Sequence, residues 1–349
     1  MGRAKSRQVN LGGIKIGGDA PISVQSMTNT DTRDVASTIE QIKQLEEAGC
    51  ELIRVAIPDM EAANKVKEIK EKISIPLIAD IHFNHKLALR VLELGIDGLR
   101  INPGNIGSED KVKELTELAN KKDVPIRIGV NAGSLEKELL TKYGAPTAEA
   151  MVESALKHVR LLEEYGFEDI IISLKASDVL MTLEAYELIA KKVNYPLHLG
   201  ITEAGTEWSG TIKSAVGIGS ILSRGLGDTI RVSLTGDPVE EVKVGYEILK
   251  SLNLRQKGPK IISCPTCGRC EINLIGVANQ VEEKIKNLDT NIKVAIMGCV
   301  VNGPGEAREA DIGIAGGKDV GLLFKRGEVI EKVPGDKLVD TLLTEIENL

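Results

Sequence analysis

The feature that most constrains the fold is a regular alternation of two kinds of segment from about residue 22 onward. Short apolar, often β-branched runs alternate with charged stretches whose apolar residues recur at helical spacing. Eight such runs occur, at residues 22–27, 51–57, 76–82, 98–103, 125–131, 169–175, 196–202 and 229–235. Eight strand–helix units occupy roughly 230 residues, and this length is close to the ~250 residues of a typical (β/α)8 barrel. The sequence therefore predicts a (β/α)8 TIM barrel that closes near residue 250.

Residues around these units support the barrel. Glycine follows three expected helices, at Gly49, Gly95 and Gly166, where a left-handed residue commonly ends a helix. Stretches such as 34–48 and 61–73 have the spacing of amphipathic helices and would form the outer layer. Residues 9–18 (VNLGGIKIGG) predict a short hairpin that covers the bottom of the barrel.

After residue 249 the pattern changes. A polar link is followed by a strand, a helix near 271–287, a strand at 293–297, a hairpin within 320–333 and a terminal helix from Asp336. A chain of 349 residues also exceeds the size that one hydrophobic core usually serves. We expect a TIM-barrel substrate domain over 1–252 and a small α/β cluster-binding domain over 253–349.

Composition narrows the class of protein. The 42% hydrophobic and 27% charged fractions are those of a soluble globular protein. No run reaches the roughly 18 apolar residues of a membrane span, and no apolar segment follows the basic N-terminal residues as a secretory signal requires. The net charge of −7 disfavours nucleic acid as a partner. We expect a cytoplasmic protein with neither a membrane nor a nucleic-acid partner.

Two cysteine-containing loops each follow an expected strand, CPTCGRC in one case and MGCVVNGPGE in the other. Loops at neighbouring strand ends can converge on one metal centre, and their glycine and proline residues let the backbone turn around a bulky cluster. Zinc ribbons usually repeat a pair of cysteines, and a ferredoxin run would need cysteine where Leu274 stands. The pattern favours an iron–sulfur cluster held by Cys264, Cys267, Cys299 and one further ligand.

The fourth ligand stays open on spacing alone. Glu306, one Gly-Pro-Gly turn beyond Cys299, would supply an oxygen atom. Cys270 would supply a fourth thiolate, or would pack as a small hydrophobic residue at the start of the following helix. Cys50 has no plausible metal partner and is expected in the core.

Polar residues are concentrated at the carboxyl ends of the expected strands, where barrel enzymes place their active sites. One interpretation is that these charges form ion pairs that rigidify the barrel. The other is that the cations, which outnumber Asp80 and Glu203, bind an anionic substrate such as a diphosphate, with Glu203 as a proton donor or acceptor. The candidate substrate-binding residues are Arg54, Asp80, His82, Arg100, Asn102, Arg127, Asn131, Lys175, Arg231 and Ser233, with Ser173 and His198 in the same strands.

The same motifs resemble a known family along the whole chain. CPTCGR and MGCVVNGPGEA, preceded by SVQSMTNTDT, LRINPGNIG, VNAGSLE and LGITEAG, are similar to the 4-hydroxy-3-methylbut-2-enyl diphosphate synthases of the methylerythritol phosphate pathway, in their compact bacterial form. The resemblance implies reductive ring opening and dehydration of 2-C-methyl-D-erythritol 2,4-cyclodiphosphate, an isoprenoid precursor. It also implies catalytic Glu203 and Glu306, flavodoxin or ferredoxin as electron donor, and a 4Fe–4S cluster on Cys264, Cys267, Cys299 and Glu306.

Two alternatives remain at this point. A pterin-type barrel transferase would bind a pterin diphosphate at the cationic mouth and keep its iron–sulfur or zinc domain as a structural part. A non-enzymatic binding module would be stabilised by redox-inert zinc.

A final expectation concerns assembly. The link after the barrel is about ten residues, which span at most ~35 Å, and barrel helices run back toward the bottom. The small domain would therefore start far from the mouth of its own barrel. Together with the resemblance, this predicts a homodimer in which each small domain completes the active site of its partner.

Overall fold

The computed structural model describes residues 3–82, 84–102, 106, 108–286, 288, 290–300 and 307–349. The chain divides into a barrel unit, Met1–Arg255, and a small unit, Gln256–Leu349. This division falls three residues after the expected domain boundary. The expected end of a strand at Pro103, the expected end of a helix at Asn287 and the candidate ligand Glu306 lie outside the described residues.

Eight parallel strands form the barrel, as the alternating pattern predicts. Their order is β8-β7-β6-β5-β4-β3-β10-β9, and a bridge between Ile172 and Leu197 joins the two ends of the sheet. The strands are β3 (Ser23–Met27), β4 (Leu52–Ala56), β5 (Leu77–Asp80), β6 (Gly98–Ile101), β7 (Ile126–Asn131), β8 (Ile170–Lys175), β9 (His198–Leu199) and β10 (Thr229–Ile230).

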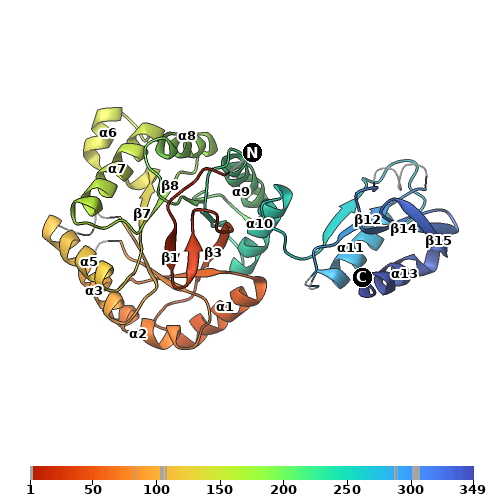
Figure 1. Ribbon diagram of the computed structural model, residues 1–349, viewed down its shortest axis with the longest axis horizontal. Helices are drawn as coiled ribbons and strands as arrows, with labels where there is room; N and C mark the ends of the chain where they lie inside the picture. The colour runs from red at the N-terminus through yellow and green to blue at the C-terminus, as the bar shows by residue number, and fades with distance from the viewer. Residues whose placement is uncertain are drawn as a thin grey trace. The chain divides into compact units, whose positions relative to one another are not determined.

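Helices surround these strands as an outer ring (Figure 1). They are α1 (Val35–Ala48), α2 (Met60–Lys70), α3 (His85–Glu93), α5 (Glu109–Lys121), α6 (Lys137–Tyr143), α7 (Ala148–Glu164), α8 (Val179–Ala190), α9 (Glu207–Leu222) and α10 (Pro238–Ser251). The barrel thus ends close to residue 250, as expected. Within the described part of the chain, no helix is both long and apolar enough to cross a membrane.

Capping residues fix where the barrel helices begin and end. The side chains of Asp34 and Asp59 accept hydrogen bonds from backbone N–H groups in the first turns of α1 and α2. The glycines expected after helices adopt left-handed backbone angles, with φ of 99°, 84° and 70° at Gly49, Gly95 and Gly166. Each therefore turns the chain back toward the next strand.

The last two barrel strands are shorter than predicted. The runs at 196–202 and 229–235 contain only the two-residue strands β9 and β10. Beyond them the backbone donors find other acceptors. The N–H of Leu234 donates to the Glu241 carboxylate at 2.9 Å, and that of Thr202 donates to a carbonyl in the loop after β8. The chain leaves the ladder early because these bonds satisfy its backbone.

A hairpin closes the bottom of the barrel, as expected. Strands β1 (Val9–Leu11) and β2 (Ile14–Ile16) pair antiparallel. Val9, Leu11 and Ile16 are buried against Leu52 and against apolar side chains at the starts of other strands. The amino-terminal end of the barrel is therefore apolar and sealed.

The small unit is built on a mixed sheet. Its strands, in the order β11-β12-β13-β14-β15, are Lys260–Ser263, Lys293–Met297, Ile312–Ala315, Val320–Lys325 and Glu328–Pro334. Strands β11, β12 and β13 pair parallel, whereas β14 pairs antiparallel with both β13 and β15. Helices α11 (Leu274–Ile285) and α13 (Leu338–Glu347) cover one face through a shared apolar cluster. Strand β13 was not predicted, because its four residues include glycine and give no clear alternation.

The thiol of Cys50 lies in the barrel core, as predicted. It is buried and donates a hydrogen bond to the carbonyl oxygen of Leu52 at 3.1 Å. Burial raises the pKa of this thiol to about 12, so it stays protonated and unreactive.

The hairpin of β1 and β2 should stabilise the barrel through its buried apolar side chains. Replacing Leu11, which is 4% exposed, by alanine leaves a cavity against the barrel bottom. We expect Leu11→Ala to lower the free energy of unfolding of the barrel unit by about 2–5 kcal/mol, measured by chemical denaturation followed by circular dichroism. The matched control is Leu180→Ala on α8, where the side chain is 74% exposed and little change is expected. Equal effects of the two substitutions would show that the hairpin does not seal the barrel.

Candidate active site

A polar cavity opens among the carboxyl ends of the barrel strands. Its volume is about 190 Å³. Its lining residues come from seven strands or the loops directly after them: Arg54, Asp80, His82, Arg100, Arg127, Asn131, Ser173, Lys175, Thr202, Arg231 and Ser233. Side chains in a strand alternate between the two faces, so residues two or four apart, such as Ser173 and Lys175, face the barrel interior together.

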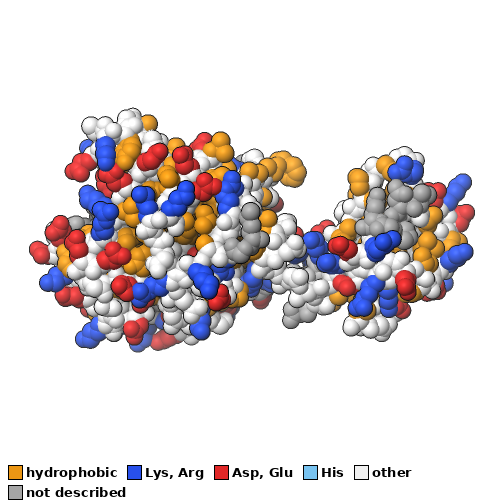
Figure 2. Space-filling model, turned by 45° about the horizontal axis from the view of Figure 1, so that its top comes forward, with side chains coloured by type: hydrophobic (Ala, Val, Ile, Leu, Met, Phe, Trp, Pro, Cys, Tyr) orange, Lys and Arg blue, Asp and Glu red, His pale blue; other side chains and the backbone are white. Residues whose placement is uncertain are grey.

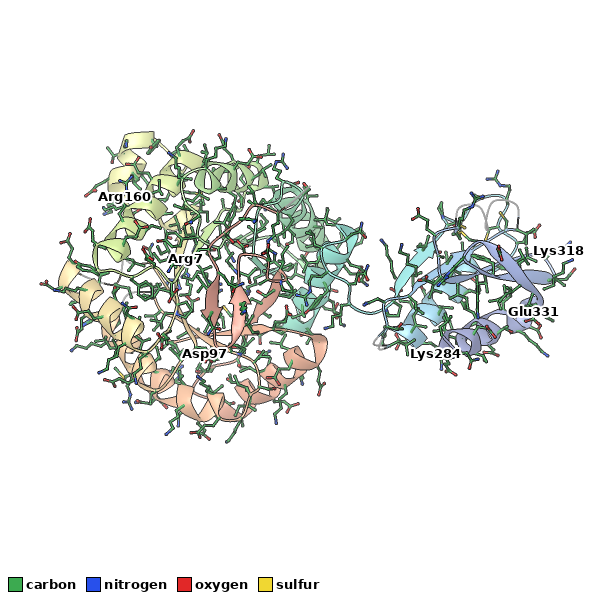
Figure 3. The ribbon with its side chains drawn as sticks, viewed as in Figure 1. Arg7, Asp97, Arg160, Lys284, Lys318 and Glu331 are labelled. Atoms are coloured by element: carbon green, nitrogen blue, oxygen red, sulfur yellow. The ribbon has the colours of Figure 1, made fainter. Side chains whose placement is uncertain are left out.

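The charges in this cavity differ from those on the outer surface. On the outside, Lys and Arg are interspersed with Asp and Glu (Figure 2), and charged side chains such as Arg160 on α7 point away from the barrel (Figure 3). Inside, the cations have few carboxylates beside them. Their side chains are also buried, with Arg54, Arg100, Arg127 and Lys175 each less than 10% exposed.

Asp80 is the carboxylate at the centre of this group. Its oxygens lie 3.1 Å from Arg100 Nη1 and 3.6 Å from Arg54 Nη1, and His82 Nε2 lies 3.6 Å away. Burial alone would raise the pKa of Asp80, but the charges of Arg54 and Arg100 and the bond from His82 hold it well below its usual range. Asp80 is therefore ionised and fixes two guanidinium groups at the cavity wall.

A second buried carboxylate comes from outside the strands. Glu241 on α10 lies 3.6 Å from Arg231 Nη2 and also accepts a hydrogen bond from Ser26 Oγ at 3.4 Å. Burial raises the pKa of Glu241, and the charge of Arg231 opposes that rise. The sequence gives no signal for this residue, since the DPVEE segment has the form of an ordinary helix start with acidic first-turn residues.

Two cations have no such partner. Within the described residues, no carboxylate lies within 4.0 Å of Arg127 or Lys175. Arg127 Nη1 donates to Gln25 Oε1 at 2.6 Å, while its Nε and Nη2 are buried without a hydrogen-bond partner in the described chain. Lys175 Nζ lies 3.5 Å from His198 Nε2. Ion pairing therefore accounts for Arg54, Arg100 and Arg231 but leaves two buried basic side chains available to an anionic ligand.

Glycines make room for these long side chains. A Cβ on Gly200 in the loop after β9 would lie 2.7 Å from Lys175 Nζ, and one on Gly129 of β7 would overlap the guanidinium of Arg100. Both side chains thus cross the barrel interior over positions that have no side chain of their own.

Most of the candidate substrate-binding residues line the cavity. Asn102 does not, and is instead buried directly after β6. The candidate catalytic residue Glu203 is exposed, next to the lining residue Thr202, and its φ of 52° is unusual for a residue other than glycine. Thr202 itself was not singled out from the sequence, because a threonine after a strand carries no distinctive signal.

In the small unit, two of the candidate cluster ligands follow adjacent parallel strands. Cys264 comes directly after β11 and Cys299 two residues after β12. The N–H of Gly298 donates to Cys264 Sγ at 3.2 Å, so the two loops are in contact. Cys267 is exposed between them in sequence. Among the described residues, no three His, Cys, Asp or Glu side chains converge as ligands of a single metal ion.

Cys270, like Cys264, lies beside the apolar cluster of the small unit. Its Sγ donates to the carbonyl oxygen of Ile272 at 3.3 Å, and its side chain packs against the apolar cluster under α11. A Cβ on Gly298 would lie 2.7 Å from this sulfur. The side chain thus behaves as a small hydrophobic residue beside the cysteine loops.

Comparisons with solved structures show the fold of the barrel. A dihydropteroate synthase from Xanthomonas albilineans matches with a TM-score of 0.51 at 12% identity, covering 71% of this chain and 99% of that one. The 3-dehydroquinate dehydratase from Geobacillus kaustophilus matches with a TM-score of 0.51 at 16% identity, covering 71% and 98%. Likeness at this identity concerns the fold alone and gives no support to the pterin-type transferase considered above.

Sequence comparisons cover both units. The GcpE TIM-barrel domain matches residues 6–246 and the GcpE protein C-terminal domain matches residues 260–348. A protein from Geobacter sulfurreducens is 65% identical over 99% of this chain and 98% of its own length, and one from Clostridium perfringens is 60% identical over the whole of both. Both are named 4-hydroxy-3-methylbut-2-en-1-yl diphosphate synthase (flavodoxin). With both of its units matched along nearly their full length, this chain belongs to the GcpE family, which confirms the resemblance seen in its motifs.

Proposed function

We propose that this chain is an oxidoreductase that converts 2-C-methyl-D-erythritol 2,4-cyclodiphosphate, with two electrons, into 4-hydroxy-3-methylbut-2-enyl diphosphate and water. The observation that carries the proposal is the cavity in which buried Arg127 and Lys175 lack a carboxylate partner among the described residues. A cyclic diphosphate supplies the negative charge that these groups need. The names of the full-length relatives support the same reaction.

In this proposal the cavity wall binds and orients the diphosphate. The guanidinium groups offer paired N–H donors that fit phosphate oxygens, and Lys175 adds an ammonium. Asp80 holds Arg54 and Arg100 in position rather than touching the anion. The polar residues that complete the substrate site are His82, Asn131, Arg231 and Ser233.

Glu203 is proposed to supply the proton for the water that leaves. It follows the cavity residue Thr202, and its left-handed backbone is a form of local strain that residues at functional sites often carry. Its exposure would let it exchange protons with solvent between turnovers.

The candidate ligands of the small unit are chemically suited to a 4Fe–4S cluster. Cys264 and Cys299 leave adjacent strand ends, and the N–H of Gly298 already donates to a ligand sulfur, as backbone groups do around such clusters. We propose Cys264, Cys267, Cys299 and Glu306 as its ligands. The assignment of Glu306 rests on the family resemblance. The bound cluster would supply the electrons. Flavodoxin, which the names of the relatives mention, or ferredoxin would deliver them, in the reducing cytosol.

The course of the chain supports a shared active site in a homodimer. Arg255 Nη1 donates to the carbonyl oxygen of Ile22 at 2.8 Å and its guanidinium pairs with Glu51, both at the starts of strands. The chain is thus held at the end of the barrel opposite to the cavity. Only residues 256–259 separate Arg255 from β11, a link of at most roughly 18 Å, similar to the ~20 Å length of α1. We therefore propose that the cluster of one subunit serves the cavity of its partner.

The metal content tests the cluster. We expect protein purified without oxygen to contain about four iron and four sulfide per chain, and Cys264→Ser, Cys267→Ser and Cys299→Ser to lose them, because each removes one thiolate ligand. Cys270→Ser is the matched control and should keep both, since Cys270 is not among the proposed ligands and its thiol already donates to the carbonyl oxygen of Ile272. Zinc without sulfide, or loss of the cluster in Cys270→Ser alone, would refute this assignment.

Turnover tests the substrate site. The cluster-loaded protein with a reduced donor should form 4-hydroxy-3-methylbut-2-enyl diphosphate from the cyclic diphosphate. Arg127→Met should lower kcat/KM by about 10- to 100-fold, because each charge-assisted hydrogen bond contributes roughly 1.5–3 kcal/mol. Arg160→Met on the outside of α7 is the control and should match the unmodified protein. An unchanged kcat/KM in Arg127→Met would favour a purely structural role for the mouth cations.

Subunit mixing tests the shared site. Glu203→Ala and Cys267→Ser should each be inactive alone. If sites form between subunits, each mixed dimer has one intact cavity facing one intact cluster, and random exchange should restore about a quarter of the unmodified activity. Mass spectrometry of differently tagged subunits would establish exchange, and exchange without recovered activity would contradict the shared site.

A further inference from the structure

Lys175 occupies an unusual electrostatic position in the cavity. It projects inward from β8, is 8% exposed, and has no carboxylate within ion-pair distance among the described residues. The charged and titratable groups that face it from the other elements are mostly positive. The positive groups are Arg54 (β4), Arg100 (β6), Arg127 (β7) and Arg231, directly after β10. His198 (β9) also faces Lys175, and the acidic Asp80 (β5) and Glu241 (α10) are bound to arginines instead.

The imidazole of His198, next to Lys175, does not supply a negative charge that would offset these positive groups. His198 is fully buried, and its Nε2 lies 3.5 Å from Lys175 Nζ. Burial, followed by the charges of Arg127 and Lys175, lowers the pKa of His198 well below its usual value. The ring is therefore neutral, and its unprotonated nitrogen can accept a hydrogen bond from the lysine nitrogen, whether that group is an amine or an ammonium.

Of the cations in the cavity, Lys175 is the one that can give up its charge. Guanidinium groups keep their proton in proteins, even where burial lowers the pKa as it does at Arg127. A lysine ammonium loses its proton readily when buried. Burial, and then repulsion by Arg54, Arg231, Arg127 and Arg100, lower the pKa of Lys175 well below its usual value.

We propose that Lys175 is an uncharged amine in the ligand-free enzyme and takes up one proton from solvent when the cyclic diphosphate enters the cavity. The inference rests on the proposed function, because the dianion is what replaces the missing carboxylate. Its two negative charges stabilise an ammonium beside them, and the new N–H bond points at a phosphate oxygen. Lys175 is thus uncharged in the empty cavity and positively charged when the cyclic diphosphate is bound, while the arginines keep their charge in both states.

Proton uptake by Lys175 makes the affinity for the ligand depend on pH in a defined direction. Ligand binding raises the pKa of Lys175, so between the ligand-free and the ligand-bound values each binding event takes up close to one proton. In that window the affinity for the cyclic diphosphate falls about tenfold for each unit of rising pH. Below the ligand-free value the lysine is already charged, and above the ligand-bound value it stays neutral, so uptake disappears at both ends.

Calorimetry of the full-length, oxidised, cluster-loaded protein can count this proton. The cyclic diphosphate is titrated without an electron donor at about pH 7.5, in buffers of different ionisation enthalpy, so that the heat depends on the protons exchanged. The phosphate groups of this ligand are strong acids and stay ionised near neutral pH. The measured uptake therefore belongs to the protein. Circular dichroism and iron content show that each variant is folded and loaded.

We expect uptake of close to one proton in the unmodified protein and in Lys142→Met, a control that removes an exposed lysine paired with Glu153. Lys175→Arg should bind with almost no uptake and an affinity that changes little with pH, since its guanidinium is charged throughout. Lys175→Met should bind more weakly, also without uptake.

Three results would overturn the inference. Tight binding to the unmodified protein without uptake means that Lys175 does not change its charge when the ligand binds. Uptake that persists in Lys175→Arg places the proton on another group, with His198 the nearest. Failure of the cyclic diphosphate to bind at all removes the proposed function and this inference together, and is distinguishable from binding without proton uptake.

Discussion

The paired contacts of one buried carboxylate organise the whole cavity. Asp80 lies within ion-pair distance of both Arg54 and Arg100, so guanidinium groups from β4 and β6 are held around a residue of the strand between them. Removing one member of a buried charge group lowers the stability of the protein by far more than the intact group adds to it, because the remaining charge is left unpaired. Asp80 therefore fixes the geometry of the site more than it stabilises the fold. Arg127 and Lys175, which have no carboxylate partner among the described residues, are left in excess.

The barrel separates stability from function along its axis. Its amino-terminal end is filled by apolar side chains under the hairpin, including Leu11 and Leu52. The barrel interior also holds buried polar atoms without hydrogen-bond partners in the described chain, such as Arg127 Nε and His198 Nδ1. Unsatisfied buried groups are unfavourable to folding, and an anionic ligand or water relieves them. The apolar packing under the hairpin thus offsets the free energy that these unsatisfied polar atoms cost.

Sequence patterns predict the barrel because its strands are buried on both faces and read as continuous apolar runs. They also predict most of the cavity, since a charge inside such a run, as at Arg127, is unfavourable unless it is paired or faces a polar space. They fail where the determining contact is tertiary. The early end of β10 depends on Glu241, which comes from a helix and looks like any acidic first-turn residue. The burial of Asn102 away from the cavity depends likewise on packing that spacing does not encode.

The excess of cations also suits the proposed chemistry. The reaction adds two electrons to a substrate that is already a dianion, and placing more negative charge on it in a medium of low polarity is unfavourable. Fixed guanidinium groups stabilise the charge as it develops, without having to reorganise, and this is the largest contribution that a preorganised site makes. Arginine is suited to this role because its charge is permanent, whereas a cavity built from lysines would lose charge through mutual repulsion. A cavity with four arginines and a single lysine combines a permanent field with one position where a proton can enter or leave.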